Sequence, residues 1–221
     1  ENFYSNDFLT SPFIVFHYKQ WFNNNDDFAN QAGFLKNFGG GGDPIPMLGV
    51  SLSAMIPIFK GFFLTLEISW DGLWDRTKLY RYGLNLFGLS AGVKYILPLY
   101  QDTFIFGVYF GGGFGIYAAD YFQQYYLPAY TLSKQKANTL SMLGYLRLGF
   151  CFIWKVGIFG IGTRFYLGEL KNFEEAGQYL HYSVSQGLRN YGGSDSRPVD
   201  AKRAVLNMYR FNLEFYFGFK L

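Results

Sequence analysis

The sequence predicts an all-β protein, an eight-stranded antiparallel up-and-down barrel that spans a membrane. Segments with apolar residues at every second position follow one another along the chain, as in strands with one apolar face. Their connections alternate between short and long, as in a meander of hairpins. Aromatic residues make up 22% of the 221 residues, and 27 residues are glycine. Charged residues make up 16%, below the usual share of about 25%.

The first four strands are expected at residues 12–22, 47–56, 62–71 and 82–97. In each, large apolar residues alternate with small or polar ones. The large residues on one face include Phe16, Leu52, Leu66, Trp70 and Leu86, and the small residues on the other include Gly49, Ser51, Ser53 and Gly92.

The last four strands are expected at residues 103–119, 139–154, 157–167 and 208–221. Their large residues include Phe106, Phe110, Leu148, Phe152, Ile161 and Phe215, and their small residues include Gly107, Gly111, Gly113, Gly115, Gly149, Gly160, Gly162 and Gly218. We interpret these glycines as room for neighbouring bulk inside a narrow barrel, or as points where the sheet bends.

Short and long connections should lie at opposite ends of the barrel. The tight turns are expected at 57–61, 98–102 and 155–156, and the longer loops at 23–45, 72–81, 120–138 and 168–207. An even number of strands places both ends of the barrel chain on the short-turn side. We expect residues 1–221 to form one domain, with residues 1–11 as a segment on the short-turn side.

The apolar face is expected to point outward, to lipid. It carries more large side chains than an eight-stranded interior can hold. In water this exterior would be an apolar patch far larger than soluble monomers show, whereas a closed barrel in lipid leaves no strand edge unpaired. The alternative is a soluble, ligand-carrying barrel, whose exterior would need charges that these strands lack.

The predicted architecture resembles the small outer-membrane barrels of Gram-negative bacteria, the OmpA, OmpX and OmpW type. The last strand carries Phe215, Phe217 and Phe219 at alternate positions, and Leu221 stands where the family usually has a terminal aromatic residue. The resemblance implies a bacterial outer-membrane location, short periplasmic turns and long extracellular loops. It also implies contact with outer-membrane lipid and recognition of the C-terminal strand by the outer-membrane assembly machinery.

Five ionisable residues are expected inside the barrel near mid-depth: Lys19, Glu67, Arg147, Arg164 and Glu214. Charges in such a place are tolerated when they are paired and hydrogen-bonded. One interpretation is an ion-pair network that fills the barrel. The other is a polar path for ions or small solutes.

The long loops are the expected functional surface. Loop 120–138 carries the candidate partner-binding residues Tyr121, Phe122, Tyr125, Tyr126 and Tyr130. Exposed tyrosines are effective contact anchors, but the same rings could instead form an aromatic girdle at the membrane surface.

A weak catalytic candidate lies in the last loop, where His181 and Ser183 stand two positions apart. A histidine beside a serine can act as base and nucleophile, and the pair is similar to that of outer-membrane lipid A deacylases. In that family asparagine follows the serine, whereas Val184 follows here, and the pair lies in an expected loop. We therefore expect no enzyme.

Taken together, these features favour a non-enzymatic membrane anchor that presents its loops to a protein partner. The alternatives are a narrow pore for ions or small hydrophobic solutes and a lipid-modifying hydrolase. The net charge of +3 is scattered, with no basic stripe for nucleic acid. We expect neither a cofactor nor a metal.

Overall fold

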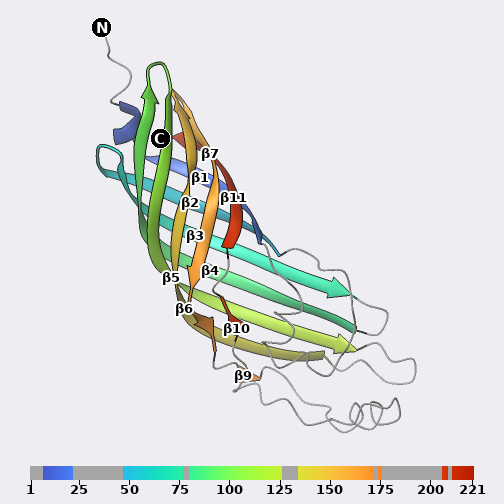
Figure 1. Ribbon diagram of the computed structural model, residues 1–221. Helices are drawn as coiled ribbons and strands as arrows, with labels where there is room; N and C mark the ends of the chain where they lie inside the picture. Colours follow the sequence, from blue (N-terminus) through green and yellow to red (C-terminus); the bar gives the residue numbers. More distant parts are fainter. Residues whose placement is uncertain are drawn as a thin grey trace, which may run out of the picture.

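Eight long antiparallel strands form a closed barrel, as the sequence predicts (Figure 1). The computed structural model describes residues 7–21, 47–76, 80–125, 134–171, 174–175, 206–208 and 211–221. The long strands are β1 (Phe13–Trp21), β2 (Leu48–Phe59), β3 (Phe62–Arg76), β4 (Tyr80–Gln101), β5 (Ile105–Tyr125), β6 (Lys134–Trp154), β7 (Gly157–Leu167) and β11 (Phe211–Lys220). Shorter elements are η1 (Asp7–Thr10), β8 (Glu169–Leu170), β9 (Glu174–Glu175) and β10 (Leu206–Asn207).

Each long strand pairs with its sequence neighbour, and the pairing of the first strand with the last completes the ring. β1 pairs with β11, which brings the first and last strands together, and β5 pairs with β6. The spatial order is β5-β4-β3-β2-β1-β11-β7-β6, with the β5–β6 pairing closing the sheet. Closure leaves no free edge along the paired part of the wall.

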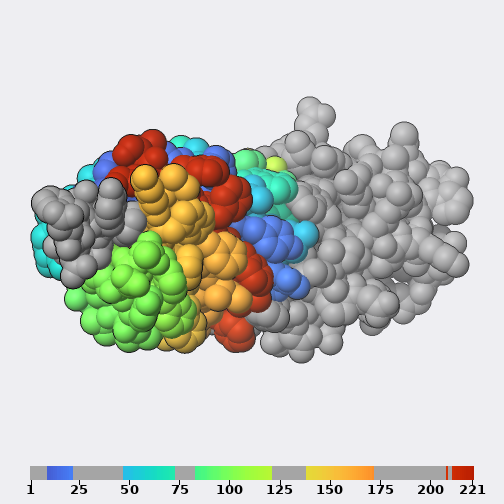
Figure 2. Space-filling model, turned by 90° about the horizontal axis from the view of Figure 1, so that it is seen from above, coloured from blue at the N-terminus to red at the C-terminus, as the bar shows by residue number. Residues whose placement is uncertain are grey.

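Side chains alternate between an apolar outer face and a buried inner face. On β1, Phe16 and Tyr18 are each 43% exposed, whereas His17 and Lys19 are buried. Figure 2 shows the molecule from above, with the green side chains of β4 and β5 beside those of β6 and β7 in yellow to orange and those of β11 in red. Among the described residues, no helix has the length and hydropathy to cross a membrane.

One residue expected on the outer face lies inside. Leu86 is fully buried, and its strand neighbours Phe87 and Leu89 point outward, at 53% and 63% exposure. Leu84 is also buried inside. Leu86 has the same parity on β4 as Gly92, which was expected inside, so placing Leu86 outside broke the alternation. Large apolar residues on both faces of this part of β4 hide the contrast between the faces.

The inner face combines tyrosines with glycines on neighbouring strands. An added Cβ at Gly160 would overlap Cζ of Tyr216, because it would lie closer than packed atoms approach. The tyrosine ring therefore occupies the space that a side chain at this position would need. The same relationship joins Tyr117 with Gly88, Tyr145 with Gly92 and Gly113, and Tyr109 with Gly149 and Gly162.

At the long-loop end, β3 to β6 project beyond the rest of the barrel (Figure 1). The β4–β5 pairing extends to Tyr80 and Tyr125, whereas the β6–β7 pairing stops at Gly144 and Leu167. The expected loops 72–81 and 120–138 were therefore too long, because strands extend into both of them. The backbone hydrogen-bonded ladder continues beyond the residues in which large apolar and small or polar side chains alternate.

The register of the wall changes beyond the end of β7. Gly168 has a φ of +130°, a conformation that favours glycine. Beyond it, β9 pairs with β6 in a register shifted by one residue from that of β7. Between the two ladders, the hydroxyl of Thr139 donates to the carbonyl of Lys171, and the Lys171 amide lies 3.4 Å from Ser141 Oγ.

The short-turn end is covered by the start of the described chain. Leu9 of η1 is 1% exposed and belongs to the same buried apolar cluster as Phe13, Phe63 and Ile158. The amide of Gly61 donates to the carbonyl of Leu9 at 3.2 Å. The part of segment 1–11 that the structure describes thus packs against this end of the barrel.

Candidate functional site

The five predicted inward charges lie together in the middle of the barrel. Lys19 comes from β1, Glu67 from β3, Arg147 from β6, Arg164 from β7 and Glu214 from β11, and each is at most 4% exposed. Alternation within each strand points their side chains inward. Barrel closure then brings them into one layer, which we call the charge layer.

Arg164 is at the centre of the charge layer. Its Nη1 and Nη2 donate to the two carboxylate oxygens of Glu67, each at 2.7 Å. Nη2 also donates to Oε1 of Glu214 at 2.6 Å. The guanidinium therefore joins β3 to β11 through charge-assisted hydrogen bonds, the strongest kind that side chains make.

Arg147 adds a second cation to Glu67, with Nη2 3.0 Å from Oε2. Its guanidinium carbon lies 4.8 Å from the ring centroid of Tyr145, and that of Arg164 lies 5.0 Å from the same centroid. The ring face offers negative potential to both cations. A single carboxylate and a single ring thus offset part of the repulsion between two arginines.

Lys19 uses a carboxylate that the sequence analysis did not include. Its Nζ donates to Oδ2 of Asp71 at 3.0 Å, and Trp21 Nε1 donates to Oδ1 of Asp71 at 3.0 Å. Asp71 lies four residues after Glu67 on β3, so both side chains point to the same face of the strand. This spacing was the sequence signal that Asp71 faces inward. It was missed because the strand was expected to end there, whereas β3 continues to Arg76.

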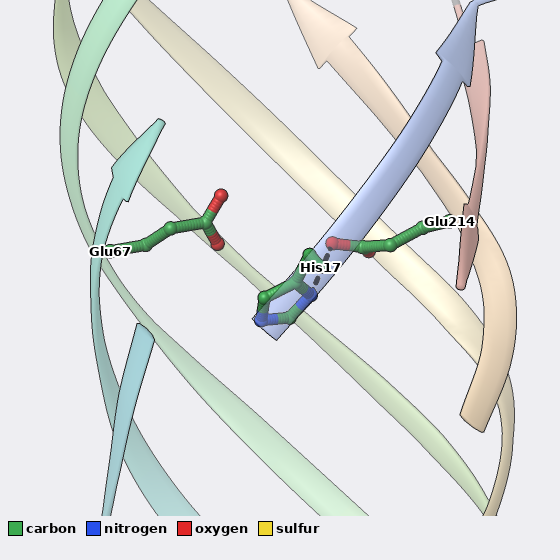
Figure 3. Close-up of side chains that lie close together, drawn as sticks. All are labelled: His17, Glu67 and Glu214. Carbon is green, nitrogen blue, oxygen red and sulfur yellow. Dashed lines mark ion pairs between the residues drawn. The ribbon is translucent and has the colours of Figure 1, made fainter. Parts of the chain in front are cut away.

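His17 is a second residue that the sequence analysis missed, although it shares the parity of Lys19. Its Nδ1 lies 2.7 Å from Oε1 of Glu214, and its Nε2 lies 2.7 Å from Ser53 Oγ. Figure 3 shows His17 and Glu214 pointing toward one another, with Glu67 approaching from the opposite wall. The ring thus extends the charge layer to β2.

His17, Glu67 and Glu214 place one ligand atom each within 4.8 Å of the others, which is close enough for a metal ion. Both carboxylates, however, already accept from Arg164, and Glu67 also accepts from Arg147. A divalent cation would have to displace guanidinium groups and add two positive charges to a buried cluster. The donor set therefore fits an ion-pair network and not a metal centre.

Lys94 is a further buried charge that the sequence analysis did not select. It is 1% exposed, and its Nζ lies 4.0 Å from the ring centroid of Tyr109 and 3.9 Å from that of Tyr216. Its parity on β4 matches that of the inward Gly92, so alternation could have identified it. Its ammonium lies between two aromatic faces.

Buried side chains cover the charge layer on both sides. Toward the long-loop end Trp21 stacks on Tyr166 at 4.7 Å, and Tyr117 packs edge-on against Tyr166 at 5.9 Å. Toward the short-turn end lie Tyr109, Tyr216 and the apolar cluster that includes Leu9. A hydrated ion crossing this part of the barrel would have to separate both layers and break ion pairs between them.

The structure describes only some of the remaining candidate binding and catalytic residues. Tyr121, Phe122 and Tyr125 belong to β5 and not to a loop, which corrects the expectation. Tyr126 and Tyr130 lie outside the described residues, as do His181 and Ser183. The candidate catalytic pair therefore stays a prediction.

No protein-family model matches the chain, and no curated protein matches it at a significant level.

Proposed function

We propose that this protein is an outer-membrane β-barrel that anchors its long loops at the bacterial surface, with a lumen closed by the charge layer. The observation that carries the proposal is the inverted distribution of polarity. The charged side chains of the described barrel core are buried inside, whereas large apolar side chains such as Phe114, Leu140 and Met142 are 64%, 70% and 69% exposed. This distribution fits a lipid environment and would be unfavourable in water.

A groove on the outer face supports contact with lipid. It has a volume of about 650 Å³ and runs from β7 over β11, β1, β2 and β3 to β4. Phe16, Trp70, Phe87 and Phe217 are among its lining residues. Such a surface accommodates acyl chains without any polar partner.

The anchoring role rests on the closed lumen. The five charges that could have lined a path are paired with one another or with Asp71 and His17. Paired charges enclosed by aromatic and apolar layers fit a plug better than a permeation path. The proposed functional surface is therefore the loop end, and the proposed role is non-enzymatic.

Quenching of tryptophan fluorescence by brominated acyl chains tests the membrane location. One variant retains only Trp70, which lines the outer groove, and a matched control retains only Trp21, which is buried against Asp71. In vesicles of brominated phospholipid we expect strong quenching of Trp70 and little quenching of Trp21. Equal quenching of both, or refolding into a soluble monomer without detergent, would contradict the proposal.

Conductance in a planar bilayer tests the closed lumen. We expect no steady channels from protein shown to be folded and inserted. Steady wild-type channels altered by Arg164→Ala would instead establish a pore, and the membrane location would stand unchanged. Retention of labelled outer-membrane lipid through long incubation tests the non-enzymatic role, whereas turnover that depends on Ser183 would overturn it.

Deletion of residues 176–205 tests the role of the last loop. The barrel ladder lies outside this range, so the variant should fold and insert. We expect it to lose binding to the cell-surface partner while a variant with an intact loop and the exposed turn substitution Val156→Ala retains it. Unchanged partner binding after this deletion would move the search to the other loops.

A further inference from the structure

The outer groove follows one hydrogen-bonded row of the barrel wall. Its floor is the backbone of Tyr216, His17, Ser51 and Ser69, which pair with one another in this order across β11, β1, β2 and β3. All four side chains are buried inside the barrel. The floor of the groove is therefore paired backbone, and these polar side chains point away from it.

Outward side chains of the two adjacent rows form the walls of the groove. On the short-turn side Phe16 stacks on Phe217, with ring centroids 5.4 Å apart, and on the long-loop side the rings of Tyr18 and Phe215 lie 6.5 Å apart. The two rows are completed by Phe159, Leu52 and Ile68 on the first side and by Val50, Trp70 and Phe87 on the second. Aromatic and aliphatic walls offer dispersion contacts to a hydrocarbon chain along the whole groove.

The groove runs obliquely across the barrel. Followed from Tyr18 through β2, β3, β4 and β5, the register reaches Leu140 on β6, whereas through β11 and β7 it reaches Phe150. Leu140 lies much nearer than Phe150 to the long-loop end of β6. The groove therefore climbs toward the long-loop end as it passes from Phe159 on β7 to Phe87 on β4.

The length and slope of the groove match one acyl chain in one leaflet of a membrane. Its lining residues come from the six neighbouring strands β7, β11, β1, β2, β3 and β4. Five spacings between strands, each about 4.8 Å, give a length of about 24 Å. Because strands in membrane barrels tilt by about 35–45°, a row perpendicular to them descends by about 14–17 Å over this length. This descent is close to half of a hydrocarbon core about 30 Å thick.

A row of polar residues borders the groove at its long-loop end. Beyond Phe87 the next outward residue of β4 is Asn85, and the register of this row leads to Gln20 on β1. In the other direction it leads to Asp120 on β5 and Asn138 on β6. Polar side chains on the outward face mark the depth at which the apolar band ends. One end of the groove thus opens beside polar groups, whereas its β7 end lies within the apolar surface.

We infer that one acyl chain of a membrane phospholipid binds in the outer groove, with its ester end near Asn85 and its methyl end near Phe159. The lipid belongs to the leaflet on the long-loop side, because the groove descends from that side through about one leaflet. In a bilayer close packing drives association, and the stacked rings provide a preformed surface for it. The inference rests on the proposed membrane location and adds that one chain is held at a defined place on the wall.

The test titrates the variant that retains only Trp70, in detergent micelles, with phosphatidylcholine that carries bromine on one acyl chain. Trp70 lines the groove near its long-loop end. We expect quenching of its fluorescence to saturate at one lipid per protein. Bromine near the ester end should quench more strongly than bromine near the methyl end.

A pair of valine substitutions tests the position of the chain. Val50→Phe adds a ring between Tyr18 and Trp70 and narrows the groove, and we expect it to weaken lipid binding by about tenfold or more. The matched control Val93→Phe changes an outward valine of β4 that lies outside the groove and should preserve the affinity. Both substitutions lie on the outer face, so the barrel interior is unchanged.

Quenching that rises in proportion to lipid without saturation, or equal affinity of Val50→Phe and Val93→Phe, would overturn the inference. Stronger quenching by bromine near the methyl end would overturn it as well. Absence of quenching in protein that migrates as a dimer would assign the groove to a second copy of the chain and also overturn it. The comparison of Trp70 with Trp21 in vesicles tests the membrane location separately, since its expected result does not depend on saturation.

Discussion

Glu67 and Arg164 meet across the barrel as a two-pronged ion pair, with both N–O distances at 2.7 Å. They lie on β3 and β7, which are not neighbours in the wall. The pair therefore spans the interior and links two halves of the sheet. At this depth the barrel interior is therefore occupied by an ion-paired layer that ties opposite walls together.

Loss of one partner from this pair should be strongly destabilising. Arg164→Met leaves Glu67 and Glu214 buried without their main cation, and we expect a loss of about 3–5 kcal/mol in the free energy of unfolding. Urea unfolding in micelles, followed by circular dichroism, measures it. Adding Glu214→Gln should recover part of the loss, because Glu214 is the carboxylate left without an arginine, whereas Glu67 keeps its pair with Arg147. A single-variant cost under about 1 kcal/mol would contradict the arrangement.

Tyrosine–glycine packing predicts which glycines tolerate a side chain. In Gly160→Ala the new methyl group would overlap Tyr216, and we expect a loss of about 1–3 kcal/mol. Gly144→Ala is the matched control, since its Cβ would find its nearest atom at 3.5 Å, an ordinary contact. Equal effects of the two substitutions in the same unfolding assay would count against this packing.

The cover at the short-turn end should contribute to stability. Leu9→Ala removes a side chain that is 1% exposed, and we expect a loss of about 2–4 kcal/mol. Val156→Ala, at a turn residue that is 58% exposed, should change stability by about 0.5 kcal/mol or less. If Leu9→Ala proves as mild as its control, η1 is not part of the core.

Burial of Cys151 predicts low thiol reactivity. The residue is 1% exposed and lies within the apolar cluster near the short-turn end. We expect maleimide to react with the folded barrel at least about a hundredfold more slowly than with the urea-unfolded chain, because modification requires opening of the structure. Rapid modification of the folded protein would show that this end of the barrel opens readily.

The sequence by itself determined the strands, because alternation is a local property of the chain. The pattern in 210–221 identified β11 and its apolar face, and the parity of Lys19, Glu67, Arg147, Arg164 and Glu214 identified five inward charges. His17, Asp71 and Lys94 also stand at inward-facing positions of the alternation. The alternation, however, shows neither how deep a side chain lies in the barrel nor which charges form pairs. Leu86 was placed on the outer face although it shares the parity of the inward Gly92, because its size and not its position in the alternation decided the assignment.

The tertiary structure decided the partners and the closure of the lumen. Glu67 lies 97 residues from Arg164, and their contact depends on the register and curvature of the whole sheet. The pairing of Tyr216 with Gly160 and the position of Leu9 under the barrel likewise depend on which strands become neighbours. The local alternation of residues determines which face of the strand a side chain points to. Barrel closure determines which side chains it contacts, because a contact across the lumen depends on the register of every strand between the two residues.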